Sequence, residues 1–267
     1  MPIIQSNGIN FAYEETGSGD SVICIMGITA PGAVWGAHTP AWESDFRCIT
    51  PDNRGVGESD KPEGPYSSEM MATDYIGLMD ELGIESAHVI GCSMGSIIAQ
   101  QIALLAPEKV KSLVLMCSWS RCDNYAKHTF EHLVNIKAAL PASQFMHYIQ
   151  QLIFTKPFFD NEECYASFAE GQAEADADPN PQPLHGLAAQ AEACKNHNVY
   201  DRLGEITAPT LVIGGEDDIF TPRWMAEEIH AKLPNSKLYL YKDAGHAFHF
   251  EYMEDFNARI LEWLKKQ

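Results

Sequence analysis

A serine between two glycines is the residue of this sequence best placed for nucleophilic chemistry. Ser93 is the centre of Gly91-Cys-Ser-Met-Gly95, which follows the apolar run Ala87–Cys92 and opens the helical run Ser96–Ala106. On such a tight strand-to-helix turn the serine backbone is strained, and the residues two before and two after it come too close for a side chain. The turn lifts the hydroxyl to a helix N-terminus, where developing negative charge is favoured. An ordinary glycine-rich turn can show the same five residues, so the prediction that Ser93 is a nucleophile depends on partners elsewhere in the chain.

A serine hydroxyl attacks a carbonyl only when a neighbouring base takes its proton. The sequence has ten histidines. His246, in Asp243-Ala-Gly-His-Ala247, lies in a loop between the apolar run Lys237–Tyr241 and the last helical segment. His249 is the nearest alternative, but it begins the approach to that helix. We therefore expect His246 to be the base.

A third group must orient the base, and it should follow the preceding strand. The segment Gly214-Gly-Glu-Asp-Asp218 ends in three adjacent carboxylates. We expect Asp218 to be the acid, with Asp217 as the alternative, because the other carboxylates are more typical of a turn cap or a solvent-exposed face.

Alternating strand and helix signals at both ends of the chain indicate how these residues are positioned. The apolar runs that predict strands are Ser21–Met26, Arg47–Thr50, Ala87–Cys92, Lys111–Cys117, Thr210–Gly214 and Lys237–Tyr241. Apolar residues at helical spacing are Met71, Tyr75, Leu78, Met79 and Leu82, between a serine and Gly83, and then Phe256, Ile260, Trp263 and Leu264. Short apolar strands between amphipathic helices predict an α/β fold with a parallel sheet covered on both faces.

The alternation breaks between about residues 120 and 200. This stretch has no clear strand signal and is typical of helices joined by loops, and strand signals resume after Pro209. We therefore predict a core domain made of residues 1–119 and 201–267, with a helical subdomain of residues 120–200 inserted into it.

Together these features resemble the α/β-hydrolase fold family over nearly the whole chain. The pieces that carry the resemblance are Met26-Gly27-Ile28, Asp52-Asn-Arg54-Gly55-Val-Gly57-Glu-Ser59, the Ser93 turn, Gly215-x-x-Asp218-x-x-x-Pro222 and Gly245-His246. The chain order serine, aspartate, histidine is that of α/β-hydrolases and differs from that of chymotrypsin or subtilisin. Within the family the sequence is most similar to the group of 3-oxoadipate enol-lactonases, small carboxylesterases and cofactor-free haloperoxidases.

The resemblance implies an eight-stranded, mostly parallel sheet with a helical cap over the active site. It also implies an oxyanion hole formed by the backbone N–H groups of Ile28 and Met94. Losing one such donor typically costs ~10²–10³ in rate. Two positions depart from the family: relatives usually have His-Gly where this chain has Met26-Gly27, and often a second glycine where it has Ser96. Neither removes a catalytic atom, but both weaken any transfer of substrate specificity.

Composition excludes several classes of partner. The formal charge is −19, from 37 acidic and 18 basic residues, which opposes binding to nucleic acid or to an anionic membrane. The start of the sequence lacks a signal-peptide pattern, and the seven cysteines are odd in number and scattered. We expect a cytoplasmic, disulfide-free monomer or homodimer that binds a small ester or lactone and needs no metal or other cofactor.

Other signals are weaker. His128-Thr-Phe-Glu-His132 matches an inverted zinc-peptidase pattern but has no assured third ligand, and Gly55-Val-Gly57 lacks the spacing of a dinucleotide loop. Cys92 should point from its strand end into the core rather than act as a nucleophile. Aromatic residues at such positions are more often core, yet four of them are candidates for lining a pocket: Trp35, Trp119, Phe154 and Phe158.

The sequence thus predicts a serine hydrolase that cleaves a small carboxylic ester or lactone through an acyl-enzyme. Three alternatives stay open. They are enol-lactone hydrolysis, carbon–carbon bond hydrolysis or perhydrolysis on the same triad, and a ligand-sensing protein that keeps the fold and only binds.

Overall fold

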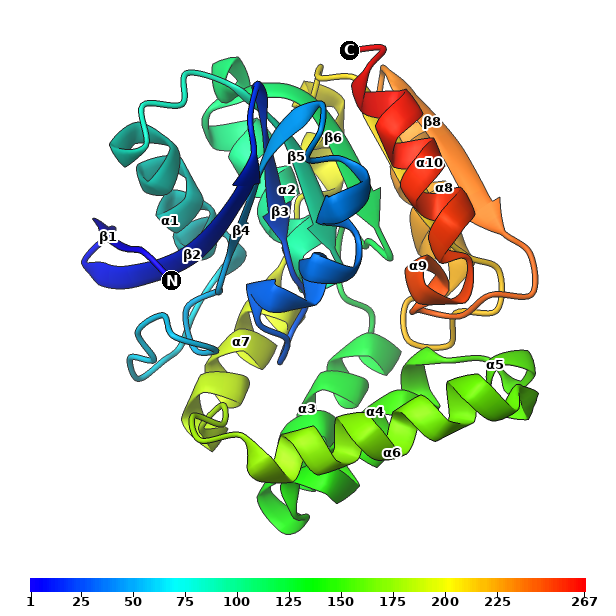
Figure 1. Ribbon diagram of the computed structural model, residues 1–267. Helices are drawn as coiled ribbons and strands as arrows, with labels where there is room; N and C mark the ends of the chain where they lie inside the picture. Colours follow the sequence, from blue (N-terminus) through cyan, green and yellow to red (C-terminus); the bar gives the residue numbers. More distant parts are fainter.

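An eight-stranded sheet forms the centre of the computed structural model, which describes residues 1–267 (Figure 1). The strands are β1 (Ile3–Ser6), β2 (Ile9–Gly17), β3 (Asp20–Ile25), β4 (Phe46–Pro51), β5 (Ala87–Cys92), β6 (Val110–Met116), β7 (Thr210–Gly215) and β8 (Ser236–Tyr241). Their order is β1-β2-β4-β3-β5-β6-β7-β8. The β1–β2 and β2–β4 pairs are antiparallel, and all other pairs are parallel. The predicted fold class, an eight-stranded and mostly parallel sheet, is confirmed.

The apolar runs of the sequence predict six of these strands to within one residue at each end, but no such run covers β1 or β2. Asn7 and Gly8 join them with φ values of 47° and 78°. A two-residue turn with positive φ at both positions matches the twist of a β-hairpin, and Asn-Gly is its typical sequence. Asn7-Gly8 is therefore the sequence signal for this hairpin.

Helices cover both faces of the sheet. One face carries α1 (Ser68–Glu81), α2 (Met94–Leu105) and α8 (Arg223–Lys232), and the other carries α10 (Met253–Leu264) with the 3₁₀ helices η1 (Gly32–Ala37) and η2 (Thr39–Ala41). Successive side chains of a strand belong to opposite faces, so Ile23 packs in the first core and Val22 in the second. The remaining short helices are α9 (Phe248–Glu251), η3 (Pro107–Lys109) and η4 (Tyr200–Glu205).

Helix α1 begins and ends where its sequence predicts. The hydroxyl of Ser67 accepts a hydrogen bond from the Met70 amide at the N-cap, and Gly83 adopts a φ of 63° just after the last turn. Met71, Tyr75, Leu78 and Met79 of its predicted apolar face are buried, and Leu82, the C-cap, is partly buried.

Five consecutive helices lie between β6 and β7, where strand signals are missing from the sequence. They are α3 (Asn124–Ala139), α4 (Ala142–Ile153), α5 (Lys156–Asp160), α6 (Glu162–Ala177) and α7 (Leu184–Asn196). Helix α4 packs on α6, and α3 packs on α7. In Figure 1 this layer lies below the sheet. We propose that residues 120–200 form a cap over the core.

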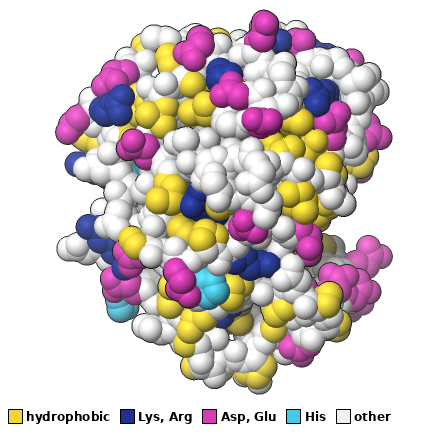
Figure 2. Space-filling model, turned by 90° about the vertical axis from the view of Figure 1, so that its left-hand side faces the viewer, with side chains coloured by type: hydrophobic (Ala, Val, Ile, Leu, Met, Phe, Trp, Pro, Cys, Tyr) yellow, Lys and Arg dark blue, Asp and Glu magenta, His cyan; other side chains and the backbone are white.

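The molecular surface mixes charges of both signs. On the face at the left of Figure 1, acidic and basic side chains alternate, and the hydrophobic ones form separate small clusters (Figure 2). No helix has the length and apolar character needed to span a bilayer.

Candidate active site

The Ser93 turn has the strained geometry that its sequence predicts. Ser93 lies between β5 and α2 with φ 52° and ψ −117°, a backbone region that non-glycine residues rarely occupy. A Cβ on Gly91 would lie 2.3 Å from the Gly95 carbonyl oxygen, and one on Gly95 would lie 2.1 Å from the Ile25 carbonyl oxygen. Because both contacts are with backbone, only glycine fits at either position, and the turn can be this sharp.

The Ser93 hydroxyl has no hydrogen-bond partner in the protein. Its Oγ atom is buried and makes no hydrogen bond within the chain. The Ser93 amide donates to the Met116 carbonyl at 2.8 Å, which fixes the turn to the neighbouring strand. Ser96, which stands where relatives often have glycine, donates its hydroxyl proton back to the Ser93 carbonyl at 2.5 Å. This departure from the family therefore strengthens the turn without touching the hydroxyl.

Asp218 and His246 meet at the ends of β7 and β8. The His246 Nδ1 atom lies 2.8 Å from Asp218 Oδ2, and both side chains are buried. Burial alone would raise the pKa of Asp218, but the facing His246, with hydrogen bonds from His246 and Thr221, lowers it below its ordinary value. Asp217, the alternative acid, is exposed. The geometry thus pairs Asp218, and not Asp217, with the histidine.

The loop that carries His246 is attached to the cap. The Ala247 amide donates to the Ile153 carbonyl at 2.9 Å. Glu251 accepts from the Gly245 amide at 2.7 Å and from the Thr155 amide and hydroxyl at 2.8 and 2.7 Å. The position of the histidine therefore depends on the end of α4 as well as on the sheet.

Two backbone amides near Ser93 are available to an oxyanion. The Ile28 amide has no acceptor within the chain. The Met94 amide opens α2, where no preceding turn can accept it. A Cβ on Gly27 would lie 3.3 Å from the Cβ of Ser93, so the loop that carries Ile28 passes directly beside the serine.

Three side chains distant in sequence hold the loop of residues 26–32, called the oxyanion loop after the role proposed for its Ile28 amide. Asn53 donates to the Met26 carbonyl at 2.9 Å. Asp52 accepts from the Gly32 amide at 2.6 Å. Gln190, from α7, accepts from the Thr29 amide at 3.2 Å, where Thr29 has a φ of 73°. These bonds hold the loop although Met26 has no polar side chain to support it.

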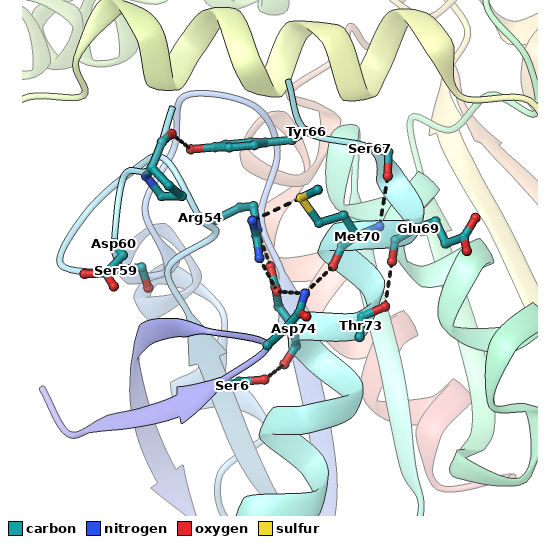
Figure 3. A network of polar contacts seen from close by, with 12 residues as sticks. Ser6, Arg54, Ser59, Asp60, Tyr66, Ser67, Glu69, Met70, Thr73 and Asp74 are labelled. Atoms are coloured by element: carbon teal, nitrogen blue, oxygen red, sulfur yellow. Dashed lines mark hydrogen bonds and ion pairs between the residues drawn. The ribbon is translucent and has the colours of Figure 1, made fainter. Parts of the chain in front are cut away.

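The segment that supplies Asn53 and Asp52 is itself fixed by a buried ion pair. Arg54 binds Asp74 of α1 through two bonds of 2.6 Å, and its Nη1 atom contacts the Met70 sulfur at 3.1 Å (Figure 3). The side chains of Arg54 and Asp74 are only 6% and 1% exposed. The Arg54 carbonyl accepts from Gln190 at 2.8 Å, so one network connects α1, the oxyanion loop and α7.

A cavity of about 550 Å³ lies between the core and the cap, with Ser93 and His246 in its wall. Its walls are mainly apolar, and Phe154 and Phe158 of the cap are among them. Trp35 and Trp119 had also been expected to line a pocket, and this prediction was wrong. They are 0% and 1% exposed, because both indoles are packed within the hydrophobic cores instead.

Sequence and structure comparisons agree on what this architecture is. A model of the α/β hydrolase fold matches residues 20–252. The chain belongs to the α/β-hydrolase fold family. Among its relatives, a Mycobacterium tuberculosis protein provisionally named as the non-heme bromoperoxidase BpoC is 33% identical, over 96% of this chain and 97% of its own. A Stutzerimonas stutzeri protein provisionally named as the carbamate hydrolase RutD is 30% identical, over 92% of each chain. A solved structure of a thermophilic esterase from Thermogutta terrifontis superimposes with a TM-score of 0.86 at 26% identity, covering 100% of this chain and 99% of that one.

Two cysteines adjoin the site of this α/β-hydrolase without being free to act as nucleophiles. Burial raises the pKa of Cys92 to about 12, so the thiolate is not formed near neutral pH. Cys117 is buried and donates its thiol proton to the His246 carbonyl at 3.1 Å. Its sulfur, one Asp218 oxygen and one His246 nitrogen lie within 4.8 Å of one another. That grouping is accounted for by the bonds these residues already make.

The histidine pair on α3 lies outside the one cluster of three potential metal ligands in the structure. His128 and His132 stack with their ring centroids 6.2 Å apart, and Glu131 between them pairs with Lys195 at 3.2 Å.

Three positioning residues were not predicted from the sequence. Thr221 binds Asp218, and Asn53 and Gln190 hold the loop beside the serine.

Proposed function

We propose that this α/β-hydrolase cleaves small uncharged carboxylic esters, lactones included, through an acyl-enzyme on Ser93. One observation carries the proposal. The unbonded Ser93 hydroxyl lies in the wall of an apolar cavity that also contains the Asp218-paired His246. Two free backbone amides beside the serine add the electrostatic component that acyl transfer needs.

The hydrogen bond between His246 and Asp218 determines which nitrogen of His246 can take a proton in the proposed reaction. Asp218 accepts the His246 Nδ1 proton, so Nε2 carries the lone pair and takes the Ser93 proton as Oγ attacks the carbonyl carbon. The Ile28 and Met94 amides stabilise the oxygen as it becomes negative. His246 then protonates the leaving alkoxide, and it later activates the water that releases the acid.

The charge of the cavity wall favours an uncharged substrate. No lysine or arginine lines the cavity, whereas Glu170 and Glu174 of α6 do. A carboxylate on the substrate would be repelled by these two side chains and would find no cation to pair with. The cavity therefore disfavours a carboxylate-bearing enol-lactone, one of the alternatives left open by the sequence.

Two esters of equal length test this proposal. The wild type should hydrolyse p-nitrophenyl hexanoate with a kcat/KM at least about tenfold above that for the p-nitrophenyl monoester of adipic acid, because the adipate carboxylate must lose water in a mainly apolar wall that offers it no cation. Ser93→Ala should abolish turnover of both. The double substitution Glu170→Gln with Glu174→Gln should bring the kcat/KM values of the two esters closer together.

Turnover that persists in Ser93→Ala would contradict the mechanism, and a preference for the adipate monoester would contradict the substrate class. Carbamate and peroxide–bromide assays belong in the same panel because relatives carry names for those reactions. If the protein binds the hexanoate ester without hydrolysing it, the family fold serves here for ligand sensing.

A further inference from the structure

A buried pair of histidines, His38 and His249, lies beside the cavity and takes no part in the proposed triad. His38, between η1 and η2, has its Nδ1 atom 2.8 Å from Asn257 Oδ1 and its Nε2 atom 2.9 Å from His249 Nδ1. The two histidines are 0% and 3% exposed. His249 stacks on Trp35, and His38 stacks on Trp42, so both rings are held in place.

The direction of these hydrogen bonds fixes the protons on each ring. The Asn257 oxygen can only accept, so His38 Nδ1 is the donor and His38 Nε2 carries the lone pair. That lone pair must accept from His249 Nδ1, and the lone pair of His249 is therefore on Nε2. Burial lowers the pKa of both histidines, and for His249 the neighbouring His38 and His246 lower it further, so the pair is neutral at pH 7.

The remaining ring nitrogen of His249 has no partner in the protein. His249 is part of the cavity wall, and Nδ1 is the only one of its two ring nitrogens that makes a hydrogen bond within the chain. Two other polar side chains of the wall, Gln150 and Ser167, are already occupied. Gln150 donates to the Phe168 carbonyl at 3.1 Å and accepts from Gln172 at 2.8 Å, and Ser167 donates to the Cys164 carbonyl at 2.7 Å.

We propose that His249 Nε2 is a specificity-determining acceptor that binds a hydroxyl or N–H group of the substrate. The proposal rests on the ester-hydrolase function and narrows its substrate to a neutral ester that carries a hydrogen-bond donor. An unpaired acceptor in an apolar wall is costly unless the ligand satisfies it, so a substrate without the donor is bound less well. His38 and Asn257 act as positioning residues that keep the lone pair on the cavity side.

Matched pairs of esters test this assignment. The pairs are p-nitrophenyl butyrate with its 2-hydroxy and 3-hydroxy derivatives, and propyl butyrate with 2-hydroxyethyl butyrate. The wild type should prefer at least one hydroxylated ester over its parent by about tenfold in kcat/KM. In His249→Asn the side-chain amide can still donate to His38, but nothing replaces Nε2, so that ratio should fall to about one.

His88→Asn is the matched control. His88 is also a buried histidine bonded through Nδ1, to the Ser112 hydroxyl at 2.9 Å, but it lies in the β5–β6 core, outside the cavity wall. Its substitution should leave the hydroxylated-to-parent ratio unchanged. A wild type without any such preference, or a preference that survives in His249→Asn, would overturn the proposal.

A binding measurement separates this inference from the proposed reaction. In the Ser93→Ala background, calorimetry should show tighter binding of methyl 2- or 3-hydroxybutyrate than of methyl butyrate, and the added His249→Asn change should remove the difference. If no ester is hydrolysed by the wild type, the catalytic proposal fails while the binding ratio still decides the role of His249. Equal binding of the three methyl esters would refute it.

Discussion

The carboxylate of Asp218 is fully occupied by donors. Oδ1 accepts from the Phe220 and Thr221 amides at 2.7 and 2.8 Å, and Oδ2 accepts from the Thr221 hydroxyl at 2.7 Å and from His246 at 2.8 Å. Four donors aimed at one carboxylate stabilise its ionised form. An ionised Asp218 in turn holds the proton of His246 on Nδ1, so Nε2 is the nitrogen that takes the Ser93 proton in the proposed reaction.

Replacing one carboxylate oxygen of Asp218 by an amide nitrogen tests this arrangement. Asp218→Asn should lower kcat by about 10³–10⁴, because an amide can present a proton to Nδ1 and force the wrong tautomer. Steady-state kinetics on p-nitrophenyl hexanoate measure the effect. Asp217→Asn is the control, since Asp217 is exposed, and it should stay within about twofold of the wild type. Equal losses in the two variants would contradict the assignment of the acid.

The residues around the serine were predictable to different degrees. Ser93 and His246 follow strands in sequence motifs, so their places could be predicted. Asp217 and Asp218 could not be separated with certainty, because the turn after β7 decides which carboxylate is buried. Gln190 gave no signal at all, since its contact with Thr29 spans 161 positions of the chain.

At the scale of elements, α7 connects the cap to the oxyanion loop. Gln190 accepts from the Thr29 amide and from Gln182 at 2.9 Å, and it donates to the Arg54 carbonyl. Gly186 of the same helix lies against Gly55, where a Cβ would come 2.6 Å from the Gly55 carbonyl oxygen. The helix is thus fixed at two points beside the loop that carries Ile28.

Gln190→Leu should therefore lower kcat by about tenfold or more while KM changes less. The Thr29 amide loses its acceptor and the oxyanion donor next to it is no longer held, which is a part of the loss expected for removing a donor altogether. Full kinetics with a thermal melt separate this from unfolding. Glu192→Gln, on the outer side of α7, should leave both parameters near wild type. A rise in KM alone would show that Gln190 serves binding and not the oxyanion loop.

The helices of the cap could be expected from sequence, but their docking could not. Asp123 and Asn161 are N-caps of α3 and α6, and such caps can be recognised locally. Which helix faces the cavity depends on contacts such as Ala247 with Ile153, between residues far apart in the chain. The core was more predictable because its strands are short apolar runs buried on both faces.

At the scale of the whole molecule, buried neutral histidines couple stability to pH. Burial lowers the pKa of His197 to about 3 and that of His88 to about 4. The unfolded value is about 6.5. Between these limits the unfolded chain binds more protons than the folded chain. The contribution of these histidines to the free energy of unfolding is therefore complete above about pH 6.5 and is lost as the pH falls toward about 4.

Each of these histidines should lower the free energy of unfolding by about 1.4 kcal/mol for each unit by which the pH falls within that window. Urea unfolding at several pH values measures the slope. His197→Asn keeps a bond to the Ser68 hydroxyl in place of Nδ1 at 2.9 Å and removes the titrating ring, so its slope should be smaller by that amount. Equal slopes in the two proteins would contradict this account.

Covalent labelling of Ser93 tests the central claim most directly. An alkyl fluorophosphonate mimics the acyl-transfer transition state and bonds irreversibly to an activated serine. Intact-mass and peptide analysis should find one phosphonyl group, on the peptide that contains Ser93, with labelling slowed by p-nitrophenyl hexanoate and absent in Ser93→Ala. Failure of the wild type to react, or equal labelling of Ser93→Ala at another residue, would contradict the assignment of Ser93 as the nucleophile.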